Sequence, residues 1–143
     1  MAGFTLSTTC KQPYDATVAL VRDELAEAGF GIITEIDLAA TFATKLEVTT
    51  PPQLILGACN PRFAYTATQA EPSVAALLPC NVVVRSVDAD TTVVEAFDPA
   101  AMARLSEDGA EERLAAMMTE VRRALLTALA RVEERSMRTN EED

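Results

Sequence analysis

The segment Gly57-Ala58-Cys59-Asn60-Pro61 has the residue types and the order that are best suited to chemistry in this chain. It places Cys59 where an apolar run ends and where Asn60 and Pro61 give the signature of a helix start. Backbone N–H groups and the dipole at a helix N-terminus favour negative charge, so a thiolate at Cys59 would be stabilised there. The segment is therefore a candidate for a reactive thiol or an anion-binding corner. Packing of a small apolar cysteine beside an ordinary helix cap explains the same residues and is the interpretation we favour.

A second cysteine–asparagine pair, Cys80-Asn81, follows Pro79 at the start of another expected strand. If the two strands are neighbours, Cys59 and Cys80 could form a redox pair, although they lack the spacing of a CxxC motif. Burial in the core is again the simpler explanation, because free cysteine is usually buried. Arg62 lies against the preference of the helix dipole, which weakly indicates an anionic partner. The candidate ligand-binding residues are thus Cys59, Asn60, Pro61, Arg62, Cys80 and Asn81, with Cys59 as the candidate catalytic residue.

Three other residues with reactive or charged side chains have ordinary explanations. Lys45 lies among apolar neighbours and would be a nucleophile or base if it were desolvated, but a lysine stem usually keeps its charge in water. Asp37 is expected to cap a helix. Cys10 has no supporting context, and we treat it as structural.

The composition excludes several classes of function. The chain has 143 residues, with 12 basic and 22 acidic residues, a net charge of −10 and no histidine. A surface of this charge disfavours nucleic acids and anionic membranes as partners. The lack of histidine removes histidine-ligated zinc or haem and serine– or cysteine–histidine catalysis, so we expect no metal and no cofactor. Three sparse cysteines and the lack of a signal sequence or membrane span predict a cytoplasmic protein.

The periodicity of apolar residues predicts alternating strands and helices. A run of β-branched and apolar residues at 54–59 predicts a central strand that is buried on both faces. A β-hairpin is expected where 80–87 and 91–97 flank the turn Asp88-Ala89-Asp90. The other expected strands are 4–8 and 30–36, and the expected helices are 13–28, 37–46, 60–70, 98–105 and 111–135.

These elements predict one α+β domain of two layers over residues 1–136, followed by a solvated tail at 137–143. We expect one mixed or antiparallel sheet of about five strands, with helices mainly on one face and a long C-terminal helix. That helix carries a heptad-like apolar stripe, formed by Leu114, Met118, Val121, Leu125, Ala128 and Val132. The stripe is wide, so packing on the sheet is favoured over a subunit interface.

Several short blocks, taken in order, resemble the family called domain of unknown function 302. They are Gly29-Phe30, Glu35-Ile36-Asp37, Leu56 to Pro61, Leu78 to Val84, Asp98-Pro99 and Met102, and they extend over about Ala19 to Leu105. The resemblance implies a compact α+β domain that associates as a homodimer, and it implies no established activity. It directs attention to the corner formed by Cys59, Asn60, Pro61, Pro79 and Cys80. The turn Asp88-Ala89-Asp90 departs from the glycine that many relatives have there.

Three functions follow as hypotheses. The first is a dimeric binding module for a small ligand or a protein partner, which the lack of an acid–base pair favours. The second is a thiol-dependent enzyme or redox sensor that uses Cys59, with Cys80 as the resolving partner. The third is a structural subunit that associates through its C-terminal helix.

Overall fold

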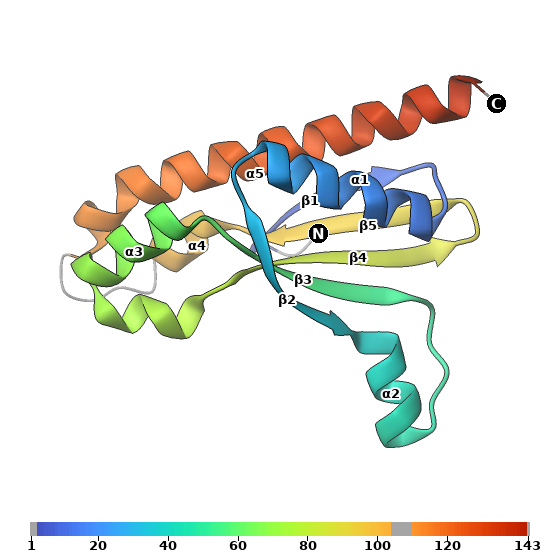
Figure 1. Ribbon diagram of the computed structural model, residues 1–143, viewed down its shortest axis with the longest axis horizontal. Helices are drawn as coiled ribbons and strands as arrows, with labels where there is room; N and C mark the ends of the chain where they lie inside the picture. The colour runs from blue at the N-terminus through green and yellow to red at the C-terminus, as the bar shows by residue number, and fades with distance from the viewer. Residues whose placement is uncertain (1–2, 104–109, 143) are drawn as a thin grey trace.

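The computed structural model describes residues 3–103 and 110–142 (Figure 1). This part of the chain contains one five-stranded sheet and six helices of the α or 3-10 type. The strands are β1 (Thr5–Cys10), β2 (Gly31–Asp37), β3 (Gln53–Cys59), β4 (Cys80–Asp88) and β5 (Thr91–Phe97). The helices are α1 (Tyr14–Glu27), α2 (Leu38–Leu46), α3 (Pro61–Ala70), the 3-10 helix η1 (Pro72–Leu77), α4 (Pro99–Ala103) and α5 (Ala110–Glu142).

The sheet is antiparallel throughout, with the strand order β1-β5-β4-β3-β2. This arrangement confirms the predicted α+β class and the hairpin of β4 and β5. The prediction that residues 54–59 form the central strand is wrong, because β4 occupies the centre and β3 lies next to the edge strand β2. Leu56 and Ala58 are buried, but Ile55 on the opposite face is only half-buried. The apolar run therefore reflects one buried face and one partly covered face rather than two buried ones.

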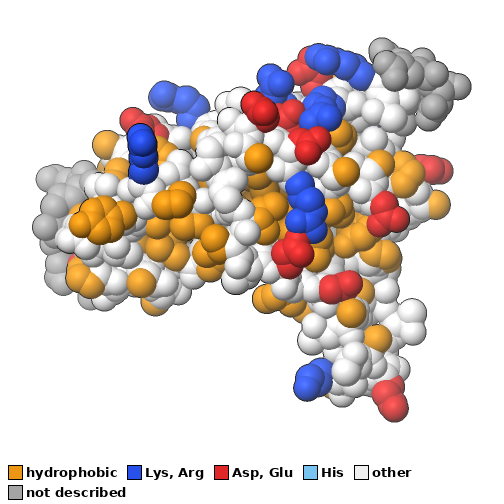
Figure 2. All heavy atoms as spheres, viewed as in Figure 1, with side chains coloured by type: hydrophobic (Ala, Val, Ile, Leu, Met, Phe, Trp, Pro, Cys, Tyr) orange, Lys and Arg blue, Asp and Glu red, His pale blue; other side chains and the backbone are white. Residues whose placement is uncertain are grey.

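Helices α1 and α5 pack on one face of the sheet and form the main core with it (Figure 1). All six residues of the apolar stripe on α5 are buried, and four of them, Val121, Leu125, Ala128 and Val132, belong to this core. The prediction that the stripe packs on the sheet is confirmed. The charged side chains gather over α1 and α5 on the outer side of this layer (Figure 2). In contrast, α2 projects away from these two helices and contains no buried residue.

Side-chain caps fix the starts of two helices as the sequence predicts. Asp37 Oδ1 accepts a hydrogen bond of 2.9 Å from the Ala40 N–H at the start of α2. Asn60 Oδ1 accepts hydrogen bonds from the N–H groups of Arg62 at 3.1 Å and Phe63 at 3.5 Å at the start of α3. Each cap satisfies backbone donors that have no partner within the helix.

Three boundaries differ from the prediction. Helix α5 continues to Glu142 instead of ending near Arg135, because the residues after Arg135 are mostly good helix formers with no proline or glycine to stop them. The 3-10 helix η1 was not predicted, since Pro72 was interpreted only as a helix end. The end of the predicted helix 98–105 lies outside the described residues, and the division between a domain at 1–136 and a tail at 137–143 stays a prediction.

Gly57 lies where β2, β3 and the start of β4 approach one another most closely. A Cβ atom at this position would overlap Thr34 Oγ1 and lie 2.7 Å from Pro79 Cγ. The threonine side chain can rotate, but the proline ring is held by the chain on both sides. Glycine is therefore required here by close packing rather than by its backbone angles.

We expect Gly57→Ala to lower the free energy of unfolding by about 1–3 kcal/mol, because the added methyl group overpacks this site. Gly31→Ala is the matched control on the neighbouring strand, where the added Cβ would meet only Cys59 O at 3.8 Å. The control should change stability by less than about 1 kcal/mol. Urea denaturation of both variants tests this, and an equal effect of the two substitutions would contradict the packing argument.

Candidate functional site

The register of β3 and β4 brings the two cysteine segments to the same end of the sheet. Ala58 lies directly opposite Cys80, so Cys59 is one residue from the cross-strand partner of Cys80. Helix α3 begins immediately after Cys59, behind the Asn60 cap. The condition for a site at this corner, that the two strands are neighbours, is thus met.

A small pocket lies at this corner, between the strand ends, α3 and the first half of α5. We call it the corner pocket, and its lining includes Phe30, Cys59, Asn60, Phe63, Cys80 and Met118. The lining is almost entirely apolar. A water-sized molecule can occupy about 30 Å³ within it, which is room for roughly two water molecules. The pocket therefore suits a small apolar group and is too narrow, as it stands, for a ligand of cofactor size.

The two thiols at the corner pocket differ in exposure. Cys59 is half-buried, whereas Cys80 is buried with 7% of its surface exposed. Burial raises the pKa of the Cys80 thiol to about 11, and the neighbouring Cys59 adds to this through its charge. Burial also raises the pKa of Cys10, which lies in the core as predicted for a structural residue. Cys80 therefore remains a neutral thiol at physiological pH, and a neutral thiol is a poor nucleophile.

The polar residues beside Cys59 serve α3. Asn60 uses its side-chain oxygen as the helix cap. Its amide nitrogen lies close to Gly29, where an added Cβ atom would be 3.4 Å from it. Pro61 forms the first turn, and both Pro61 and Arg62 are exposed and do not line the corner pocket. Of the six candidate ligand-binding residues, the structure thus brings Cys59, Asn60 and Cys80 together at the pocket.

Asn81 lies away from this pocket. Side chains alternate between the two faces of a strand, so Asn81 points to the face opposite Cys80. It lines a separate groove of about 390 Å³, together with Val83, Arg85 and Glu95. The structure thus places Asn81 and Cys80 on opposite faces of β4, and a shared site for the two residues stays a prediction.

The other residues considered from the sequence have structural positions. Lys45 is exposed in the last turn of α2, where its charge complements the helix dipole. Among the residues that the structure describes, no group of three or more cysteine, aspartate or glutamate side chains is placed to hold a metal ion. Within the same part of the chain, no helix is both long and apolar enough to cross a membrane.

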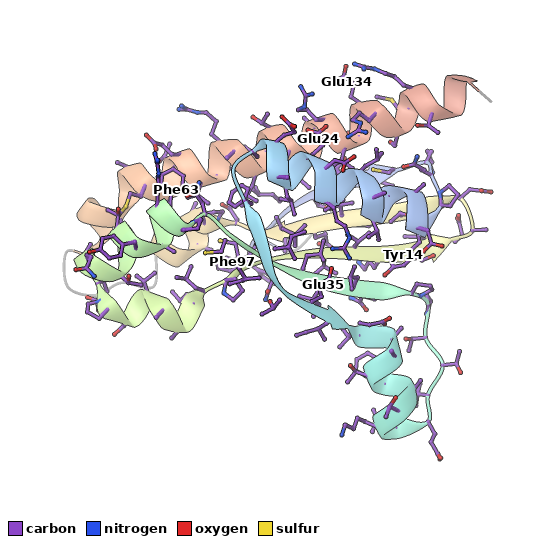
Figure 3. All side chains as sticks on the ribbon, in the orientation of Figure 1. Tyr14, Glu24, Glu35, Phe63, Phe97 and Glu134 are labelled. Carbon is purple, nitrogen blue, oxygen red and sulfur yellow. The ribbon has the colours of Figure 1, made fainter. Side chains whose placement is uncertain are left out.

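The sequence analysis missed one buried carboxylate, Glu24 on α1. Its side chain is 3% exposed and forms ion pairs with Arg131 at 2.8 Å and Arg135 at 3.1 Å, both from α5. Figure 3 shows Glu24 at the boundary between α1 and α5. The signal in the sequence was a glutamate on the apolar side of α1, beside Val21 and Leu25, which are both buried. A charge in that position requires paired partners, so Glu24 joins the two helices.

We expect iodoacetamide to label Cys59 in the folded protein, while Cys80 and Cys10 react only after denaturation. The reason is that Cys59 alone of the three is exposed to solvent, and the other two thiols are buried with raised pKa values. Peptide mass spectrometry after timed labelling separates the three sites, and Cys59→Ser is the control. Labelling of folded Cys80 as rapid as that of Cys59 would contradict this assignment.

The raised pKa of Cys80 also predicts how stability changes with pH. The thiol has a pKa near 9.0 when unfolded and about 11 when folded. Above pH 9 the unfolded state therefore loses its proton first, and the stability contributed by the protonated thiol falls until about pH 11.

Wild type should exceed Cys80→Ala in unfolding free energy at pH 7.5, and that difference should shrink by about 2–3 kcal/mol by pH 11. Urea denaturation at a series of pH values measures it, and the other titrating groups cancel because both proteins share them. A constant difference across this range would show that Cys80 is not desolvated in the folded state.

Comparisons with known proteins agree with this fold. A crystal structure described as an uncharacterized conserved protein DUF302 from Bacillus stearothermophilus matches with a TM-score of 0.79 and 21% sequence identity, over 92% of this chain and 99% of that chain. No curated protein matches the sequence. The family model described as Domain of unknown function DUF302 matches residues 6–132. The chain therefore belongs to the DUF302 family.

Proposed function

We propose that this protein is a homodimeric binding module that holds a small apolar group in the corner pocket and performs no covalent chemistry of its own. The observation that carries the proposal is the pocket itself, an apolar recess at the end of the sheet whose few polar groups are two thiols and one amide. Binding sites of small molecules are typically apolar recesses with a few polar groups that fix orientation. Family membership supports an uncharacterised domain and gives no activity.

The groups around the corner pocket favour binding over catalysis. The side-chain oxygen of Asn60 already accepts hydrogen bonds from the N–H groups of Arg62 and Phe63 as the cap of α3, and Cys80 is held neutral by burial. A general acid or base would need a titrating group within hydrogen-bond distance of the bound molecule. Among the described residues that line the pocket, only Cys59 and Cys80 titrate at all.

The thiol-dependent alternative keeps one supporting observation, the exposure of Cys59 beside a second thiol. A resolving cysteine has to ionise in order to attack, and the pKa of about 11 at Cys80 opposes this. The alternative based on the C-terminal helix has less support, since the apolar stripe of α5 is used within the chain. We place the protein in the cytoplasm, in keeping with its three free thiols.

Xenon tests the proposal as a probe of the pocket, because a single xenon atom suits a recess with room for roughly two water molecules. We expect it to shift the amide NMR signals of Phe63, Cys59 and Met118 in wild type, because these residues line the pocket. Ala64→Leu is the matched variant, since Ala64 is half-buried on α3 and lines the same pocket. The longer side chain should fill the space and abolish the shifts while the rest of the spectrum is retained.

Equal shifts in wild type and Ala64→Leu would mean that xenon binds elsewhere. An unchanged wild-type spectrum under saturating xenon pressure would mean that the corner pocket does not admit a ligand, and the binding-module proposal would fail.

A further inference from the structure

The face of the sheet opposite α1 and α5 carries an apolar row that crosses three strands. Ile36 on β2 lies directly opposite Ile55 on β3, and Ile55 lies directly opposite Val83 on β4. Ile36 is 47% exposed, while Ile55 and Val83 are half-buried. An antiparallel sheet that faces water on one side normally presents polar residues there. A continuous row of β-branched apolar side chains on that side points to a partner.

Beside this row lies an ion pair that is satisfied within the chain. Arg85 donates hydrogen bonds to Glu95 Oε1, at 3.0 Å from Nε and 2.7 Å from the terminal nitrogen. Thr5 donates its hydroxyl to the other carboxylate oxygen of Glu95 at 3.2 Å. We call the surface formed by Ile36, Ile55, Val83, Arg85, Val93 and Glu95 the open face. Its groove of about 390 Å³ runs along Val83, Arg85 and Glu95.

The charge of the open face suits a second copy of the same chain. In a two-fold symmetric interface each group meets the same surface of its partner, so an excess of one sign would repel. The chain as a whole has a net charge of −10, but Arg85 and Glu95, which form an ion pair on the open face, together contribute no net charge. Charged side chains also gather over α1 and α5 (Figure 2). Two open faces can therefore approach with Arg85 of each copy beside Glu95 of the other.

Association through the edge strand β2 is less suitable. The register of β2 shifts between Ile32 and Thr34, so a bulge interrupts its row of backbone groups. Glu35 on the same edge is paired with Arg22, and the side chain of Asp37 caps α2. A bulge in an edge strand opposes pairing with a second strand. Packing of face on face avoids this obstacle, because it buries side chains instead of extending the ladder.

We infer that the open face is the contact surface of a symmetric homodimer, in which the apolar rows and the Arg85–Glu95 pairs of two copies meet. The inference rests on the homodimer that is part of the proposed function, and it names the surface that forms it. The corner pocket lies on the other side of the sheet, under α3, so dimerisation would leave it accessible.

Sedimentation velocity over a range of protein concentrations tests the surface. Wild type should be a dimer, and Ile36→Glu should weaken dimerisation at least about tenfold. Leu126→Glu is the matched control, since Leu126 is similarly exposed, at 40%, but lies on α5. It should leave the dimer intact, and circular dichroism should show that both variants remain folded, because neither side chain is buried.

A charge exchange tests the symmetry. Arg85→Glu and Glu95→Arg should each weaken the dimer, because each places like charges together at the interface. Mixing the two variants should restore association as a heterodimer, which native mass spectrometry distinguishes by mass. A dimer that survives Ile36→Glu, or a mixture that yields no heterodimer, would overturn the open face as the interface while the homodimer itself stands. A monomeric wild type would overturn both, whereas xenon binding tests the corner pocket alone.

Discussion

The structure depends on the burial of one face of α5 against α1 and one face of the antiparallel sheet. Val121, Leu125, Ala128 and Val132 from the helix join Val82, Val84, Val94 and Ala96 from the sheet in a single core. Each fully buried valine or leucine contributes about 1.5–3 kcal/mol relative to exposure. Because two helices cover only one face, the layer arrangement also decides that the other face of the sheet is left open.

The same packing creates the corner pocket. Helix α5 extends past the end of the sheet, where Leu114 and Met118 pack with Ala67 of α3 and Val74 of η1 in a second, smaller core. The junction between the two cores lies at the ends of β3 and β4, where the close approach of Gly57 and Pro79 holds the strands. Packing at a junction is less complete than within either core, which explains a recess at this point.

Charged side chains lie on the outer side of α1 and α5, away from the apolar core that these helices form with the sheet. The buried carboxylate of Glu24 is compensated by Arg131 and Arg135, which ties α1 to α5 beneath a charged outer surface. A paired buried charge of this kind fixes how two helices align more than it adds net stability. Since acidic and basic residues are concentrated there, the net charge of the whole chain says little about the open face.

The sequence by itself determined the local structure and part of the site. The caps at Asp37 and Asn60, the hairpin of β4 and β5 and the stripe on α5 depend on residues that are close in sequence or on a regular period, so patterns reveal them. The family resemblance was also within reach, and the family model confirms it. The neighbourhood of Cys59 and Cys80 stayed conditional on the strand order, which the pairing of β3 with β4 supplies. Continuation of α5 to Glu142 was missed because helix ends are weakly specified when no proline or glycine stops them.

Only the tertiary structure decided which strand lies at the centre, which side chains share a face and which thiol is buried. β4 became central because β1 pairs with β5 over a long stretch of chain, a contact that no local pattern encodes. The row of Ile36, Ile55 and Val83 follows from register across strands. The raised pKa of Cys80 follows from burial by residues distant in sequence. Register and burial are properties of assembled strands and helices, and they exist only once the sheet has formed.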